Sequence, residues 1–364
     1  MKAKLTVLIG LLLASQTTTL FAYPGESVVR DSNGDYNITY WNGANMMHAK
    51  FYPATKIEPR VNSSYSLSVK DLIIYRYAIF NGATAKQPIT SVDIKNITRV
   101  YGYKPMIEIT SQTTPQEGIA AVQVMSAPLA KPDKWVGAVD QDPSNESALQ
   151  AGWFYSPDDD VNVLRMGVMP GNVVRGFGFS SFDLPGIENA QLQGEVNEHG
   201  VYEDEGPSPG ESAIVPQLDQ IEQNDFIARP VAEPLISVPV PFAASVVLDR
   251  IRTHIATWPG KQLLDSAYAA QLDRYLAAAA DAYRLNNTKA GREHIESVRK
   301  LLEHEHKYLD RDDEDNDDTP EHKAATRLTI DRLAARVLDF DLRYVLKRTE
   351  KEREHDHDAG DHRR

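Results

Sequence analysis

ISVPVPFAASVVLDRIRTHI, residues Ile236–Ile255, is the segment in which the hydrophobic repeat of this 364-residue chain changes. Before it, apolar and polar residues alternate in short runs, as they do in half-buried β-strands. Within it, Val247, Ile251 and Ile255 recur at a spacing that places them on one face of a helix. We therefore expect a multidomain chain, all-β before this segment and all-α from residue 245 onward.

The stretch DLIIYRYAIFNGAT, residues 71–84, is typical of the part that precedes the change. Alternating positions would share one face of a strand here, and these are Ile73, Tyr75, Tyr77 and Ile79. Short runs of this kind, separated by Gly, Pro, Asn and Asp, predict an antiparallel β-sandwich over residues 23–197. Trp135 and Trp153 are expected in its core or at its edge, the alternative being a platform for a ligand.

The segment 198–244 is rich in proline. Seven of the chain's 21 prolines fall between Pro207 and Pro241. Proline fixes φ and removes a backbone hydrogen-bond donor, so this segment is expected to be an extended, acidic linker without a fold of its own.

Helical periodicity continues over residues 245–348 and predicts a small antiparallel bundle. Thr319, with Pro320 at the first helical position, is a plausible N-cap for its last helix. That helix has a wide apolar face and is expected at the centre of the bundle. Residues 349–364 form a charged tail that is expected to be disordered. His355 and His357 within it are candidate ligands for a transition metal, although a solvated polar end also explains them.

Two stretches of the helical part resemble the FIMAH-type domain found at the C-termini of bacterial exported proteins. They are AAAADAYRLNNTKAGREHIESVRKLL, residues 277–302, and RLTIDRLAARVLDFDLRYVL, residues 327–346. A long acidic insertion between them departs from the family pattern. Residues 170–194 resemble the end of an uncharacterised immunoglobulin-like sandwich domain of exported proteins. These resemblances imply a bacterial, cell-exterior setting and bring no catalytic residues.

Residues 1–22 read as a secretory signal peptide. Lys2 and Lys4 precede an apolar run, Leu5–Leu13, which is shorter than the roughly 20 residues that a membrane span needs. Cleavage after Ala22 would make Tyr23 the first residue of the mature chain. The expected location is therefore periplasmic, extracellular or at the cell surface, with no membrane insertion after removal of the signal.

Composition narrows the chemistry further. The sequence contains no cysteine, so disulfides, thiolate nucleophiles and zinc–thiolate sites are excluded. A formal net charge of −13 argues against nucleic acid as a partner, because phosphate binding needs a positive field.

Residues 310–321, DRDDEDNDDTPE, place eight carboxylates beside one arginine. Read as a twelve-residue calcium loop, they would supply oxygen ligands from Asp310, Asp312, Glu314 and Glu321. Asp315 stands where such loops need a glycine, so weak ion binding and a solvated connector stay open as alternatives. Ca²⁺ is the cofactor that this stretch suggests.

No nucleophile elbow, phosphate-binding loop or zinc-protease helix occurs in the sequence, and no catalytic residue is assigned. We expect an exported, non-catalytic binding or assembly protein, whose sandwich binds an extracellular polysaccharide or a surface protein and whose helical domain is accessory. One alternative is a secreted hydrolase with carboxylates in the loop SPDDDVN, residues 156–162. Another is a calcium-responsive matrix component.

Overall fold

The computed structural model describes residues 23–103, 129–156, 167–195, 201, 206–207, 212–305 and 329–361. The chain divides into two compact units. The N-terminal unit comprises Met1–Ala54 and Val196–Asp225, and the main unit comprises Thr55–Glu195 and Phe226–Arg364.

The N-terminal unit is an antiparallel three-stranded sheet with one helix packed on it. Ile38 and Tyr40 alternate with exposed or half-buried residues along the central strand, and their side chains meet Leu218 of the helix in a small apolar core. The elements are β1 (Ser27–Arg30), β2 (Tyr36–Trp41), β3 (Met46–Phe51) and α2 (Val215–Gln223).

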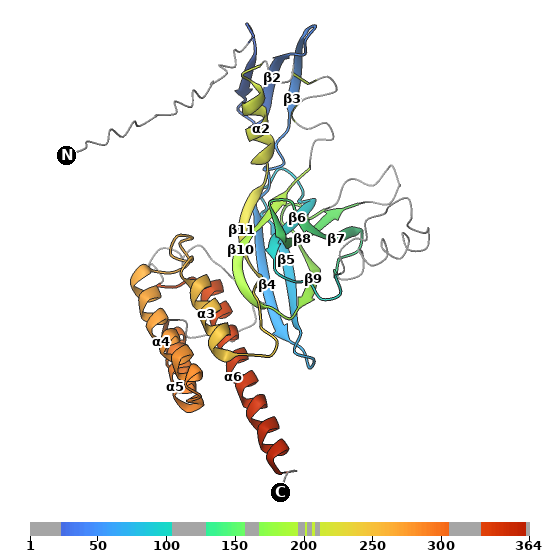
Figure 1. Ribbon diagram of the computed structural model, residues 1–364. Helices are drawn as coiled ribbons and strands as arrows, with labels where there is room; N and C mark the ends of the chain where they lie inside the picture. Colours follow the sequence, from blue (N-terminus) through green and yellow to red (C-terminus); the bar gives the residue numbers. More distant parts are fainter. Residues whose placement is uncertain are drawn as a thin grey trace, which may run out of the picture. The chain divides into compact units, whose positions relative to one another are not determined.

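The main unit contains two antiparallel sheets, labelled in Figure 1. The three-stranded sheet has the order β4-β5-β9, and the expected alternation in β5 is confirmed because Ile73, Tyr75, Tyr77 and Ile79 are all buried. The five-stranded sheet has the order β11-β10-β6-β8-β7. The bounds are β4 (Pro59–Leu67), β5 (Ile73–Asn81), β6 (Ser91–Ile97), β7 (Trp135–Asp142), β8 (Asn145–Tyr155), β9 (Val173–Ser181), β10 (Leu184–Gln193) and β11 (Ile227–Ile236).

Aromatic side chains fill the space between these two sheets. Trp153 of β8 lies 6.2 Å from Tyr77 and 6.3 Å from Phe179, measured between ring centroids. Trp135 contacts Phe177 edge-on at 4.8 Å. Both tryptophans are therefore core residues, as predicted, and are closed to a ligand.

Helices follow from residue 244 onward, which confirms the predicted change of repeat. They are α3 (Ala244–Ile255), α4 (Ser266–Arg284), α5 (Thr288–Glu305) and α6 (Arg332–Asp361). The Asp265 carboxylate caps α4 by accepting the backbone N–H of Ala267 at 2.8 Å. Within the described residues, no helix has the length and apolar character required to span a membrane.

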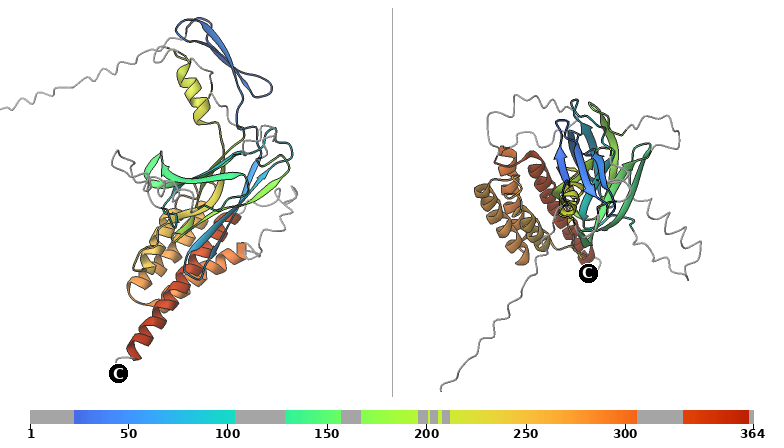
Figure 2. Two further views of the ribbon diagram at one scale, coloured as in Figure 1. Left: turned by 90° about the vertical axis from the view of Figure 1, so that its right-hand side faces the viewer. Right: turned by 90° about the horizontal axis from the view of Figure 1, so that it is seen from above.

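The helices and the sheets share one hydrophobic core, which corrects the expectation of separate all-β and all-α domains. Figure 2 shows α6 between the sheets and the α4–α5 pair. Phe340 of α6 packs edge-on against Tyr65 of β4, and Leu338 and Leu342 are buried on the same helix. The wide apolar face of α6 is thus explained by contact with the sheets as well as with the helices.

The expected linker at 198–244 contains α2 and the whole of β11, so that prediction is wrong. β11 is the edge strand of its sheet, where proline is tolerated. Pro230 and Pro234 stand in phase with Ala232, whose N–H points away from β10 and donates to Ser63 Oγ at 3.0 Å. A backbone N–H at Pro230 or Pro234 would also point away from β10. Proline at these two positions therefore removes no hydrogen bond between β11 and β10.

The prediction of a disordered tail at 349–364 is also wrong, because α6 continues through Asp361. Glu, Lys and Arg are good helix formers, and they are frequent in this last part of α6. Asp331 begins it by accepting the N–H of Leu333 at 2.8 Å. The predicted cap at Thr319 and Pro320 lies outside the described residues.

Candidate functional site

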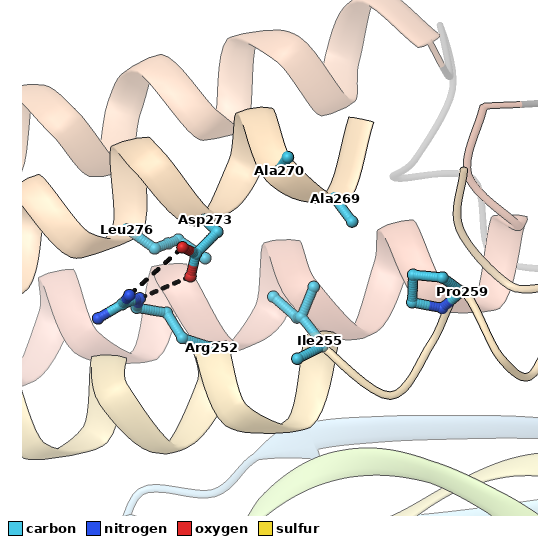
Figure 3. A pocket seen from close by; sticks show the side chains of 8 residues that line it. Arg252, Ile255, Pro259, Ala269, Ala270, Asp273 and Leu276 are labelled. Carbon is cyan, nitrogen blue, oxygen red and sulfur yellow. Dashed lines mark hydrogen bonds and ion pairs between the residues drawn. The ribbon is translucent and has the colours of Figure 1, made fainter. Parts of the chain in front are cut away.

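A pocket of about 200 Å³ opens between α3 and α4 (Figure 3). Its floor is apolar, since Ile255 and Leu276 are buried and belong to the shared core. Four other lining residues are small or rigid, which leaves the space open: Ala256, Pro259, Ala269 and Ala270. The charged pair Arg252 and Asp273 completes the lining.

Arg252 and Asp273 form a two-pronged ion pair at the mouth of the pocket (Figure 3). Arg252 Nε lies 2.8 Å from Asp273 Oδ1 and Nη2 lies 3.3 Å from Oδ2. The hydrogen bonds to Asp273 are the largest influence that raises the pKa of Arg252. Such a half-exposed pair contributes little to stability, but it fixes the position of both charges.

The same ion pair extends into a line of alternating charges across α3 and α4. Arg252 Nη1 also contacts Asp249 Oδ1 at 3.1 Å. Asp249 in turn pairs with Arg284, whose second nitrogen lies 2.5 Å from Asp281 Oδ1. The two charges that line the pocket, Arg252 and Asp273, are paired with each other, so the pocket favours neutral or polar groups over a free ion.

Glu233 of β11 is a fully buried carboxyl group in the main unit. Neither of its oxygens has a hydrogen-bond partner among the described residues. Burial, followed by repulsion from Glu188, raises its pKa well above the ordinary value. Burial without a hydrogen-bond partner therefore favours the neutral form of this carboxyl group over the charged form.

His254 of α3 joins the helices to the five-stranded sheet. Its Nε2 accepts the backbone N–H of Ile187 at 2.8 Å. Burial, aided by the charge of Lys261, lowers the pKa of His254 to about 4. Gly186 permits this close approach, because a Cβ at that position would lie 2.6 Å from the same nitrogen.

Lys261 completes this contact between the helices and the sheet. Its ammonium group donates to the Ile187 carbonyl at 3.0 Å and to Glu188 Oε2 at 2.8 Å. Both bonds hold β10, so the residues around His254 serve to attach the helical layer.

The predicted calcium ligands Asp310, Asp312, Glu314 and Glu321 lie outside the described residues. The same is true of residues 157–162 of the proposed hydrolase loop, and of the side chains of His355 and His357 on α6. Within the part of the chain that the structure describes, no three acidic or histidine side chains gather to hold a metal ion.

Sequence reasoning missed the pocket between α3 and α4. A signal was present in the adjacent alanines Ala269 and Ala270, which line the pocket together with Pro259. Alanines on a helix indicate close packing as readily as an open space, so the pocket depends on how the two helices diverge.

No protein-family model, curated protein or solved structure matches this chain.

Proposed function

We propose that this chain is an exported, non-catalytic binding or assembly protein of the bacterial cell exterior. Its binding site would be the pocket between α3 and α4, and the occupant would be one apolar side chain of a surface protein. The observation that carries the proposal is the pocket itself, with an apolar floor and an ordered ion pair at its mouth.

The size of the pocket favours a single side chain. Sites for small molecules and cofactors begin at about 300 Å³, and this pocket holds about 200 Å³. Protein interfaces, in contrast, commonly place one bulky apolar residue in a small pocket near their centre. A leucine- or phenylalanine-sized anchor is therefore the occupant that the volume suits best.

The chemistry of the pocket agrees with this occupant. Ile255 and Leu276 would be covered by the anchor, while Arg252 and Asp273 would lie at the polar edge of the interface. Because the floor residues belong to the shared core, the site needs little reorganisation on binding, which reduces the entropic penalty.

The sequence predicted that the β part binds the partner and that the helical part is accessory. We now propose the reverse. The helical layer, which we propose is the FIMAH-type module, becomes the partner-binding part. The sheets, for which an immunoglobulin-like sandwich stays our proposal, become the frame that holds it. The signal-like residues 1–22 and the net charge of −13 support export as a free protein. Polysaccharide is the alternative ligand for the test.

The test uses two substitutions of the same kind on one helix. Ala270→Leu would fill the pocket, because Ala270 lines it. Ala267→Leu, near the start of α4 and exposed, is the matched control. The purified protein and both variants would be screened against a displayed peptide library and a glycan array.

We expect peptides with a bulky apolar residue to bind the parent protein and the control. Binding to Ala270→Leu should be at least about tenfold weaker, which corresponds to the loss of one anchored side chain. Peptide binding that persists in Ala270→Leu, or binding of glycans alone, would refute the proposed site.

A further inference from the structure

The backbone nitrogen of Tyr23 is held by a carboxylate. It donates to Glu26 Oε2 at 2.9 Å, and the Glu26 backbone N–H donates back to the Tyr23 carbonyl at 3.1 Å. The Tyr23 ring lies 6.1 Å from the Trp41 ring. Tyr23 is thus fixed by its backbone and its side chain at the start of the N-terminal unit.

The Glu26 carboxylate also joins distant parts of that unit. Its Oε1 accepts the backbone N–H of Trp41 at 2.9 Å, and its Oε2 accepts the hydroxyl of Ser212 at 2.6 Å. Ser212 belongs to the segment Val196–Asp225, which returns to the N-terminal unit late in the chain. One carboxylate therefore ties three separate stretches of sequence together.

We propose that the peptide bond before Tyr23 is a processing site and that Glu26 is the receptor for the ammonium group that processing creates. A peptidase of the export machinery would break the C–N bond between Ala22 and Tyr23. Water would supply the hydroxyl for the new carboxylate and a proton for the new amine. This inference rests on the proposed export of the chain.

The new terminus would bind Glu26 more strongly than the amide does. A free α-amine has a pKa near 7.7–8.0 and is mostly protonated at neutral pH, so the hydrogen bond becomes an ion pair. Tyr23 and Glu26 are half-buried, and solvent screening limits the gain. We expect the opening equilibrium of the N-terminal unit to become about fivefold less favourable after processing.

The gain depends on pH in a defined direction. The described contacts place the Glu26 carboxylate at this nitrogen, and Trp41 and Ser212 contribute uncharged groups to the same carboxylate. Pairing favours the ammonium form in the folded state. The stabilisation is therefore complete below about pH 7.7 and is lost as the pH rises through the folded-state pKa.

The experiment compares full mature chains that begin at Tyr23 with chains that carry Gly-Ser before Tyr23. Each is made with Glu26 or with Glu26→Gln. Glu222→Gln is the matched control. Glu222 lies in the same unit and accepts the Val201 N–H at 2.9 Å, a hydrogen bond that does not involve Tyr23. Hydrogen exchange of the Ser27–Trp41 segment is followed at about pH 6.5 and about pH 9.5, the two sides of the α-amine pKa.

We expect the chain that begins at Tyr23 to exchange about fivefold more slowly than the extended chain at the lower pH. That difference should vanish at the higher pH and in Glu26→Gln, and it should persist in Glu222→Gln. If the chain that begins at Tyr23 and the chain extended by Gly-Ser exchange equally fast at the lower pH, both with Glu26 in place, the proposal is overturned. If Glu26→Gln fails to fold, a second measurement is made on the mature chain with Glu26. The rate at which its α-amine is acylated is followed against pH, which gives the pKa of that amine. A raised amine pKa would support the ion pair, and an ordinary one would overturn it.

Terminal sequencing of protein recovered from an exporting host separates this inference from the binding proposal. A mature chain that starts at another residue would overturn the processing site, whatever the peptide screen shows. A chain that starts at Tyr23 while the peptide screen fails would support the processing site and leave only the partner-binding pocket refuted.

Discussion

The ring of Phe340 on α6 lies edge-on against the ring of Tyr65 on β4, with centroids 4.9 Å apart. Tyr65 stands opposite Tyr75 on the neighbouring strand, and Tyr75 stacks on Phe179 at 5.5 Å. Phe179 in turn stacks on Trp153 of the five-stranded sheet. An unbroken series of aromatic contacts therefore joins the helical layer to both sheets of the main unit.

Replacing Phe340 with alanine should destabilise the sheets and helices together. Phe340 is half-buried, so the expected loss is about 2–3 kcal/mol, just below the range for fully buried phenylalanines. Urea unfolding would measure it. Phe154→Ala is the control, since Phe154 is 48% exposed on β8 and its removal should change stability by no more than about 0.5 kcal/mol. Equal effects of the two substitutions would refute the importance of the Tyr65 contact.

His254 should make the protein sensitive to mild acid. Its pKa is about 4 in the folded protein and 6.5 as the ordinary value, so between these pH values the unfolded chain binds more protons. The stability it contributes is complete above pH 6.5 and is lost as the pH falls to about 4, by about 3 kcal/mol in total.

His254→Gln keeps an acceptor for the Ile187 N–H and should flatten this pH dependence. His304→Gln, at an exposed position of α5, should leave it unchanged. The free energy of unfolding at pH values on both sides of the window is the measurement. A slope that survives in His254→Gln would show that another group is responsible.

Glu233 should have the opposite pH dependence. Burial raises its folded-state pKa well above 4.5, so above that pH the unfolded chain releases a proton that the folded protein retains. Stability therefore falls as the pH rises above 4.5.

Relative to the parent, Glu233→Gln should be more stable at pH 8 than near pH 4.5. The unfolded parent chain gains stability by ionising at residue 233, and an amide does not ionise. Glu303→Gln, at an exposed position, serves as the control. A constant difference between parent and Glu233→Gln across this range would contradict the assigned protonation state.

Calcium is expected to raise the unfolding temperature by about 2–4 °C, since a divalent ion relieves repulsion among the eight carboxylates of residues 310–321. Asp312→Asn combined with Glu321→Gln should remove the effect. Magnesium separates the alternatives: a formed calcium loop responds to calcium alone, and a repelling charge run responds to both ions. If neither ion changes the unfolding temperature, residues 310–321 are a simple connector.

The sequence predicted the elements of the main unit better than their assembly. The repeat of Val247, Ile251 and Ile255 identified α3 correctly, and alternation identified β5. Both signals are local, because they depend only on which face of one element is buried. The contact of Phe340 with Tyr65 joins residues far apart in the chain, and no periodicity within either element specifies it.

Proline caused the largest error. Pro230 and Pro234 suggested a linker, yet both lie in β11. The rule that excludes proline from strands applies to a strand paired on both sides, and an edge strand has one free side. Which strand forms the edge is decided by the whole sheet, so the residues of β11 alone could not reveal it.

The candidate site was less predictable than the fold. Arg252 and Asp273 lie on different helices, and their pairing depends on the packing of α3 against α4. The acidic residues predicted as ligands lie close together in the sequence, between Asp310 and Glu321. The pocket, in contrast, is formed mostly by alanines and core residues, which carry no chemical signature.

The sheets and the helices of the main unit should unfold as one, because they share one hydrophobic core. Hydrogen exchange at increasing urea, followed separately for peptides from β5 and from α6, tests it most directly. We predict the same opening free energy and the same urea dependence for both. An α6 that opens at clearly lower urea while β5 stays protected would contradict the shared core.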